Sequence, residues 1–249
     1  MVEQKRGGMV SLDEEKGKVL LPSLVEGRLL RRYKRFLADV ELTSGEVITA
    51  HCNNTGSMKG CAEAGSRVWL SISDNPKRKH PYSWELVEAG ECLVGINTIL
   101  PNLLVARSIE AGVVPALSGY DEVKREVTVT KGTRLDMVLY GKGTPACNVE
   151  VKNCTLVREG VAAFPDAVSE RGRKHLLTLA DLKEKGERSV IFFLIQRPDA
   201  TSFTPADDID PAYGETLRDV ARKGVEIEAW RARVTTEAVC LEMKLPVTL

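Results

Sequence analysis

Two carboxylates and a lysine stand at a spacing that suits the hydrolysis of a phosphodiester bond. Asp136 lies in one run of alternating apolar and polar residues, and Glu150 and Lys152 lie in the next. Mg²⁺ and Mn²⁺ prefer oxygen ligands, typically carboxylates completed by water and substrate phosphate. Such an ion activates water, while a lysine orients that water or neutralises the transition state. The three residues are candidate catalytic residues, and both carboxylates are candidate ligands of Mg²⁺ or Mn²⁺.

A β-hairpin is the element that must bring these residues together. Alternation with a period of two predicts strands at 134–140 and 146–152, joined by a turn centred on Gly143. In that register Asp136 faces Glu150. The register also pairs the apolar residues with one another, and a one-residue slip would mix the two faces. The other pairs are Arg134 with Lys152, Leu135 with Val151, Met137 with Val149 and Leu139 with Cys147.

The same hairpin is also compatible with an ordinary solvated surface. Arg134 and Lys152 would then screen the two acids, and the E-x-K pattern is common by chance. Two carboxylates directly opposite each other repel, however, and a divalent cation would offset that cost. The choice between a surface hairpin and a metal site therefore depends on the rest of the chain.

Composition predicts a soluble globular protein. The chain has 249 residues, of which 43% are apolar and 28% charged, with a formal net charge of zero. Nucleic acid would therefore bind through a local patch rather than through bulk charge. No apolar run approaches the ~20 residues that span a bilayer, and residues 1–18 lack the apolar core of a signal peptide. We expect a cytoplasmic protein with no membrane partner and with six free cysteines, because no C-x-x-C pair occurs.

Two domains follow a short extension. We predict a disordered extension at 1–18 and an all-β barrel of the OB-fold at 19–96, since five short strands separated by turns favour that fold. The pattern then changes to alternating helices and strands, which predicts an α/β mixed-sheet domain at 97–249. The predicted barrel strands are 28–42, 46–52, 67–73, 82–88 and 91–96, and the predicted helices are 97–111, 169–185 and 211–223.

Several blocks together resemble the sugar fermentation stimulation protein family. They are LRRYKRF at 30–36, NTGSMK at 54–59, EVKNCTL at 150–156, FPDA at 164–167 and ERGRKHL at 170–176. The resemblance implies an OB-fold joined to a domain of the PD-(D/E)xK nuclease superfamily, DNA binding, and a role in regulating sugar metabolism. Nucleases of this kind often act as homodimers.

By this resemblance Asp136, Glu150 and Lys152 match the superfamily core. The chain departs from the family pattern at Met137, where an aromatic residue is usual, and at Cys154, where serine is usual. Neither change removes a ligand oxygen.

Two further carboxylates are candidate metal ligands. Glu126 lies in the strand that precedes Asp136, and its alternative role is that of an exposed strand residue. Asp166 follows Pro165 just before a helix; it could contact the metal through water or simply stabilise a turn.

Three groups of residues are candidates for binding nucleic acid. Cations at the start of a helix oppose the helix dipole, which suggests a phosphate partner; a solvated basic face is the alternative. His175 by itself fits a proton shuttle and a histidine packed on a helix face equally well. Basic and aromatic residues on the first barrel strand suit backbone tracking and base stacking, although a charged strand edge also prevents aggregation. The candidates are Arg171, Arg173, Lys174 and His175 at the helix, Arg31, Arg32, Tyr33, Lys34 and Arg35 on the strand, and Lys59 in a glycine-containing loop.

These observations favour a DNA-binding protein with a metal-dependent nuclease site. The first alternative is a non-catalytic DNA-binding regulator of sugar metabolism genes on a nuclease scaffold. The second is an enzyme acting on a phosphorylated sugar, against which the chain lacks any nucleotide or sugar-phosphate loop motif.

Overall fold

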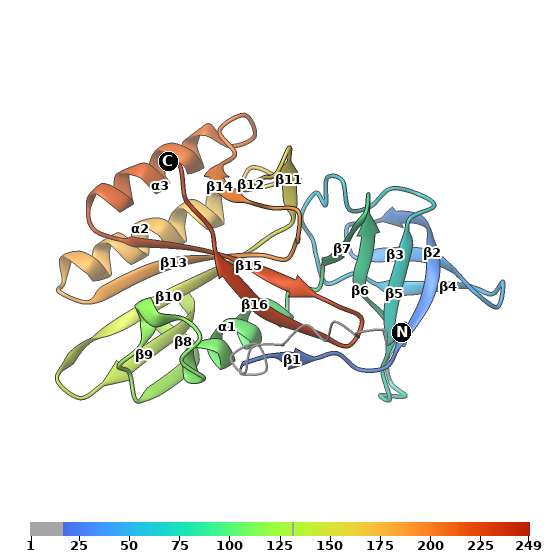
Figure 1. The fold of residues 1–249 in the computed structure, drawn as a ribbon, viewed down its shortest axis with the longest axis horizontal. Coiled ribbons are helices and arrows are strands. Elements are labelled where there is room, and N and C mark those ends of the chain that lie inside the picture. Colours follow the sequence, from blue (N-terminus) through green and yellow to red (C-terminus); the bar gives the residue numbers. More distant parts are fainter. Residues whose placement is uncertain (1–16, 131) are drawn as a thin grey trace, which may run out of the picture.

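The chain builds two lobes of different architecture, a β-barrel and a larger mixed sheet covered by helices (Figure 1). The structure, a computed structural model, describes residues 17–130 and 132–249. All but the last two residues of the predicted extension therefore lie outside the described residues.

The barrel lobe confirms the predicted OB-type architecture. Its strands have the order β4-β3-β2-β5-β6-β7, and a further pairing between β4 and β6, at His51 and Ser83, closes the barrel. Alternate residues point inward around buried Trp84 and Leu29. The strands are β2 (Leu24–Tyr33), β3 (Leu37–Leu42), β4 (Val47–His51), β5 (Arg67–Ile72), β6 (Tyr82–Ala89) and β7 (Cys92–Gly95).

The predicted single strand over 28–42 is wrong. The chain reverses at Lys34 and Arg35, so that β2 and β3 pair antiparallel. Both turn residues have left-handed backbone angles, with φ of 49° and 66°. Turns of this kind usually carry Asn-Gly or another glycine pair, so Lys-Arg gave no turn signal.

The second lobe confirms the predicted mixed sheet. Its seven strands have the order β1-β16-β15-β13-β10-β9-β8, with β10, β13 and β15 parallel and the other neighbours antiparallel. Val19 and Leu20, at the start of the range assigned to the barrel, form β1 and add an edge to this sheet. The strands are β1 (Val19–Leu20), β8 (Glu122–Thr130), β9 (Thr133–Gly141), β10 (Thr144–Cys154), β13 (Arg188–Ile195), β15 (Glu226–Val234) and β16 (Ala238–Lys244).

Helices cover both faces of this sheet. Helix α1 (Leu100–Glu110) packs on one face, and helices α2 (Glu170–Glu184) and α3 (Pro211–Arg222) pack on the other (Figure 1). The buried strand β13 contributes apolar side chains to both layers, as its nearly continuous apolar sequence requires. The central strand β10 therefore lies between α1 on one side and α2 on the other.

The start of α2 follows from its sequence. The Ser169 hydroxyl accepts a hydrogen bond from the Gly172 N–H at 3.0 Å, which is the predicted N-cap. Two short strands just before this cap and a third after β13 form a small sheet, which the prediction missed because its strands are short. These strands are β11 (Leu156–Arg158), β12 (Val161–Phe164) and β14 (Ser202–Pro205).

Two further expectations concern the cysteines and membrane-spanning segments. All six cysteines are free thiols, and five of them are buried. None of the described helices combines the length and apolar character needed to cross a membrane.

Candidate metal-binding active site

The candidate site lies where strands β9 and β10 part. Their ladder pairs Leu139 with Cys147, Val138 with Asn148 and Met137 with Val149, which confirms the predicted register for these residues. Nearer the turn a bulge shifts the register, so that Thr144 pairs with Gly141. No pair follows Met137 and Val149, although β10 continues beside β13 as far as Cys154. Asp136 and Glu150 are thus the first residues beyond the end of the shared ladder.

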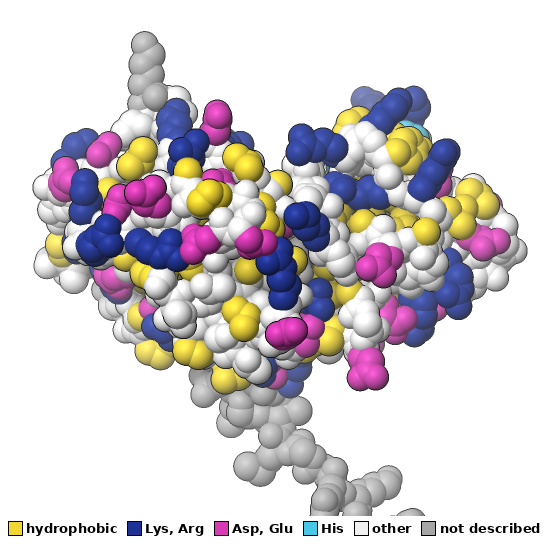
Figure 2. All heavy atoms as spheres, turned by 90° about the horizontal axis from the view of Figure 1, so that it is seen from above, with side chains coloured by type: hydrophobic (Ala, Val, Ile, Leu, Met, Phe, Trp, Pro, Cys, Tyr) yellow, Lys and Arg dark blue, Asp and Glu magenta, His cyan; other side chains and the backbone are white. Residues whose placement is uncertain are grey.

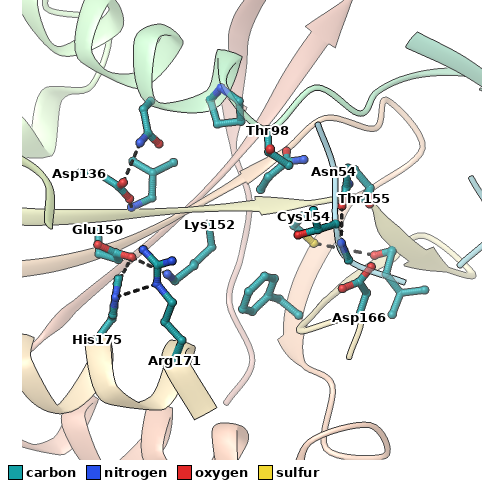
Figure 3. A pocket seen from close by; sticks show the side chains of 18 of the residues that line it. Asn54, Thr98, Asp136, Glu150, Lys152, Cys154, Thr155, Asp166, Arg171 and His175 are labelled. Carbon is teal, nitrogen blue, oxygen red and sulfur yellow. Dashed lines mark hydrogen bonds and ion pairs between the residues drawn. The ribbon is translucent and has the colours of Figure 1, made fainter. Parts of the chain in front are cut away.

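Asp136 fills the gap that the departing strand leaves. Its Oδ2 accepts a hydrogen bond from the Val151 N–H at 2.8 Å, so a side chain serves that amide in place of a strand partner. Its Oδ1 accepts from the Asn102 side chain of α1 at 2.6 Å. Both bonds hold the carboxylate on the side of β10 that faces α1 (Figure 3).

Glu150 turns towards the other helix layer. Its Oε1 is shared by the Nδ1 of His175, on α2, and by the Nζ of Lys152 at 2.5 Å (Figure 3). Its Oε2 is buried and has no hydrogen-bond partner among the described residues. Glu150 is only 2% exposed, so this carboxylate oxygen is a desolvated acceptor of the kind that proteins normally satisfy.

The parting of the strands makes three predicted pairs wrong. Asp136 does not face Glu150 in the ladder, because its carboxylate is held on the α1 side whereas Glu150 turns towards α2. Leu135 packs in the apolar layer under α2 and α3, whereas Val151 packs in the layer under α1. Arg134 does not face Lys152; it forms a 2.9 Å ion pair with Glu126 on β8. Beyond the end of the ladder nothing forces the two strands to keep matching faces.

The pKa values of the two carboxylates are shifted in opposite directions. Burial and the charge of Glu150 raise the pKa of Asp136 to about 6. Burial would also raise the pKa of Glu150, but hydrogen bonding to His175 and the charge of Lys152 outweigh it and hold that pKa below its ordinary value. Strongly perturbed carboxylates in a cleft are typical of functional sites. A bound cation would favour the ionised form of both.

The available ligands fit an ion such as Mg²⁺, which keeps several water ligands, rather than an ion that protein side chains coordinate completely. The part of the chain that the structure describes contains no group of three or more His, Cys, Asp or Glu side chains arranged to hold a metal ion. Mg²⁺ usually takes one or two carboxylates and keeps water and phosphate as its other ligands. Asp136 and the unpartnered oxygen of Glu150 are sufficient for that mode.

The two further candidate ligands have other partners. Glu126 is half-exposed in its ion pair with Arg134 and does not line the cavity at Asp136. Asp166 does line that cavity, but its Oδ2 accepts hydrogen bonds from the Met58 N–H at 2.9 Å and the Ser57 hydroxyl at 3.0 Å. Asp166 therefore connects the second lobe to a loop of the barrel.

Both lobes line the cavity that contains the carboxylates, which we call the junction cavity. It has a volume of about 350 Å³. One wall is the barrel loop Asn54–Gly56, and the opposite wall is α2 at Arg171 and His175 (Figure 3). Asp136, Glu150, Lys152, Thr98 and Asn102 are among its other lining residues. A ligand in this cavity would contact barrel and sheet together.

The predicted basic residues of α2 divide into two kinds. Arg171 and Lys174 are exposed and line a second cavity of about 380 Å³ that also touches Arg134. His175 is buried between the two cavities, where its Nε2 accepts a 3.4 Å hydrogen bond from Arg171. Arg173 is half-buried, and its Nε has no partner among the described residues. His175 is therefore part of the carboxylate site rather than of the surface.

The predicted barrel residues also serve different purposes. Arg31 and Tyr33 share a face, as expected, and both donate to the Asp39 carboxylate. Arg32 is turned inward to backbone carbonyls of the loop that walls the junction cavity. Lys34 and Arg35 are exposed in the β2–β3 turn, and Lys59 is exposed in the loop after Gly56.

Asn102 and Asp39 are partners that sequence reasoning missed. Asn102 lies 34 residues from Asp136 in the chain, and only the packing of α1 on the sheet brings them together. An asparagine in an amphipathic helix carries no signal of such a role. Asp39 occupies an alternating strand position whose side of the barrel is fixed by pairing with Arg31.

Comparisons with known proteins follow the same two-lobe division. Residues 30–96 match the family described as the SfsA N-terminal OB domain, and residues 99–238 match the sugar fermentation stimulation protein RE domain. A sugar fermentation stimulation protein homolog from Geobacter sulfurreducens is 54% identical over 230 residues, which cover 92% of this chain and 98% of the relative. Another, from Maricaulis maris, is 51% identical over 227 residues, covering 91% and 97%.

A solved structure is similar over both lobes. It is described as Pyrococcus furiosus SfsA in complex with Ca²⁺ and has a TM-score of 0.85 at 26% sequence identity. The similarity covers 93% of this chain and 98% of that chain.

Proposed function

Because this chain belongs to the sugar fermentation stimulation protein family, we propose that it binds DNA and hydrolyses phosphodiester bonds with Mg²⁺ or Mn²⁺. The second lobe would then be a nuclease domain of the PD-(D/E)xK type. The barrel would hold the nucleic acid whose backbone enters the junction cavity. The description of one similar structure as a Ca²⁺ complex supports an oxygen-ligand cation in this family.

The observation that carries the proposal is a buried Glu150 oxygen without a partner in the described part of the chain, close to a second buried carboxylate, Asp136. The Oε2 of Glu150 has no hydrogen-bond partner within the described residues, and the pKa of Asp136 is raised to about 6. Burying charge without compensation is costly. A divalent cation between the two carboxylates would compensate both groups and, when bound, would supply an activated water and stabilise the phosphoryl charge.

The surrounding side chains have positioning and electrostatic roles in this proposal. Asn102 orients Asp136, and His175 orients Glu150, so that each carboxylate keeps one oxygen in a fixed place. Lys152, whose ammonium already contacts Glu150, would neutralise charge that develops on the phosphate or orient the attacking water. Arg171, exposed at the rim, would contact a neighbouring phosphate.

Cleavage assays test this proposal directly. Labelled single- and double-stranded DNA and RNA would be incubated with the pure protein in EDTA, Mg²⁺ or Mn²⁺. We expect cleavage only with metal, and its loss in Asp136→Ala and Lys152→Ala. Asp207→Asn removes a carboxylate that pairs with Arg218 on the surface and serves as the matched control. Absence of cleavage, or cleavage that survives both site variants, would overturn the proposal.

One observation favours a second candidate, a DNA-binding regulator without turnover. Asp136 already accepts two hydrogen bonds from the protein, so that carboxylate is satisfied without a metal. Binding of DNA in EDTA that weakens steeply as salt rises, with no cleavage under any metal, would favour this candidate.

A further inference from the structure

The β2–β3 turn carries an exposed aromatic side chain where a soluble domain would normally place a polar one. Phe36 is 45% exposed. The imidazole ring of His51 lies beside it, with ring centroids 6.4 Å apart and planes tilted by 42°. Lys34 and Arg35 precede Phe36 and are exposed as well. An open aromatic face bordered by cations matches the chemistry of a nucleobase with its phosphates.

The other aromatic residue of this hairpin is already engaged. The Tyr33 hydroxyl donates to Asp39 at 3.0 Å, and the Arg31 guanidinium lies over the tyrosine ring at 5.0 Å from its centroid. A base cannot take that ring face without displacing the arginine. Phe36 in the turn is therefore better placed for stacking than Tyr33, one face of which is already covered by Arg31.

The backbone of the turn holds this arrangement at a conformational cost. Lys34 and Arg35 both have left-handed φ angles, which residues with a Cβ adopt unfavourably. Strained backbone on a surface commonly marks a functional segment. Here the strain places two cations and the phenyl ring at the same tip.

Arg32 connects this tip to the junction cavity. Its Nη2 donates to the carbonyl oxygens of Arg35 at 2.7 Å, Asn54 at 2.9 Å and Gly56 at 2.8 Å. Asn54 and Gly56 line the cavity that contains the carboxylates. The turn and the cavity wall are thus held to each other by one guanidinium group.

Basic side chains lie on both sides of the junction cavity. Figure 2 shows lysine and arginine side chains beside hydrophobic ones on the barrel lobe, next to the recess between the lobes. Beyond the carboxylates, Arg171 and Lys174 line the second cavity, which shares Arg171 and His175 with the first. A phosphate backbone would meet cations before and after the scissile position.

We propose that Phe36 and His51 form a base-stacking platform for single-stranded nucleic acid whose backbone continues over Asn54–Gly56 into the junction cavity. The substrate is single-stranded because the bases of a duplex are paired and stacked, so no ring face is available to Phe36. This inference rests on the proposed function in that it names the substrate class of the same site.

The test measures binding of a fluorescent single-stranded DNA of about 16 nucleotides, the upper limit for one OB-fold, to the full chain in EDTA, where cleavage does not interfere. We expect Phe36→Ala to weaken binding about 5-fold to 140-fold, the loss of one stacked base (~1–3 kcal/mol at 1.4 kcal/mol per factor of ten). Phe36→Trp should retain affinity, and its added tryptophan emission should be quenched by the DNA. A matched duplex should bind more weakly and respond little to Phe36→Ala.

Val47→Ala is the control, because Val47 is an exposed apolar residue at the other end of β4, about 13 Å along the strand from His51. Unchanged affinity in Phe36→Ala, an equal loss in Val47→Ala, no quenching in Phe36→Trp, or equal binding of duplex would each overturn the inference. Cleavage by the wild type with normal binding by Phe36→Ala would overturn only this inference. Binding that depends on Phe36 in a protein without cleavage activity would overturn only the proposed nuclease function.

Discussion

Two aspartates of this chain, Asp39 and Asp136, both lie on β-strands near a basic side chain, yet their pKa values are shifted in opposite directions. Asp39, on the barrel, accepts hydrogen bonds from Arg31, Tyr33 and Thr49. Burial would raise its pKa, but these three bonds lower it overall. Asp136, in the sheet lobe, has a pKa raised to about 6 because burial and the charge of Glu150 outweigh its own two bonds.

The difference separates a carboxylate whose acceptors are satisfied by the protein from a carboxylate pair that leaves one acceptor without a described partner. Around Asp39 the surrounding donors satisfy the carboxylate, and Arg31 is largely exposed at 72%, so the cluster stabilises the barrel modestly. At Asp136 and Glu150 two carboxylates are buried near each other and one oxygen has no described partner. Natural proteins keep such arrangements where a ligand or an ion completes them.

Catalysis should show the largest contrast between the two aspartates. We expect Asp136→Ala and Glu150→Gln each to lower kcat/KM at least about a hundredfold, or ~2.7 kcal/mol of transition-state stabilisation. Asp39→Asn should change kcat little. Steady-state cleavage of labelled DNA with Mn²⁺ measures this, and an equal loss in Asp39→Asn would remove the distinction.

Stabilisation by metal should follow the same division. Mn²⁺ at a hundred times its Kd should add about 2.7 kcal/mol to the free energy of unfolding of the wild type. The addition should vanish in Glu150→Gln and persist in Asp39→Asn. Thermal unfolding against Mn²⁺ concentration gives the comparison. Retained stabilisation in Glu150→Gln would place the ion elsewhere.

Without metal, neutralising the two aspartates should have effects of opposite sign. Asp136→Asn removes a buried charge and should raise the free energy of unfolding in EDTA by about 1–2 kcal/mol. Asp39→Asn removes a satisfied acceptor and should lower it by about 1 kcal/mol or less. Urea unfolding of the three proteins measures both shifts. Destabilisation by Asp136→Asn would show that the carboxylate is a structural group.

The effect of pH on stability in EDTA should also differ in direction. The folded pKa of Asp136, about 6, lies above its ordinary value, so its ionisation destabilises the fold progressively as pH rises from about 4 through about 6. The advantage of Asp136→Asn should therefore disappear near pH 4. Asp39 has a lowered pKa, so its stabilising contribution is present above about pH 4 and is lost at lower pH. Urea unfolding of wild type and both variants from about pH 2.5 to about pH 7 covers both transitions. A pH-independent advantage of Asp136→Asn would contradict the expected signs.

The sequence determined the position of the hairpin but not where its strands part. Apolar alternation gave the register of β9 and β10 because a slipped register would expose Met137 and Val149, and the structure confirms those pairs. The ladder ends because the Asp136 side chain takes the Val151 amide and α1 supplies Asn102. That is a contact between distant segments, and local periodicity contains no information about it.

The roles of the individual charged residues were harder to predict from the sequence. Arg32 and Asp166 were predicted to meet DNA or metal, yet both are engaged with the 54–58 loop. His175 was a candidate for contacting phosphate and also for packing on a helix face, and its burial against Glu150 confirms the packing. The turn at Lys34 and Arg35 was missed because its residues are not those that favour a left-handed backbone.

Anomalous scattering from a crystal soaked in Mn²⁺ would show directly whether the ion binds between Asp136 and Glu150. We expect one strong peak within coordination distance of an Asp136 oxygen and of the Glu150 Oε2, with Lys152 beside it. A protein saturated with Mn²⁺ that shows no peak there, with Asp136 still bound to Asn102 and Val151 and Glu150 still bound to His175, would contradict this expectation.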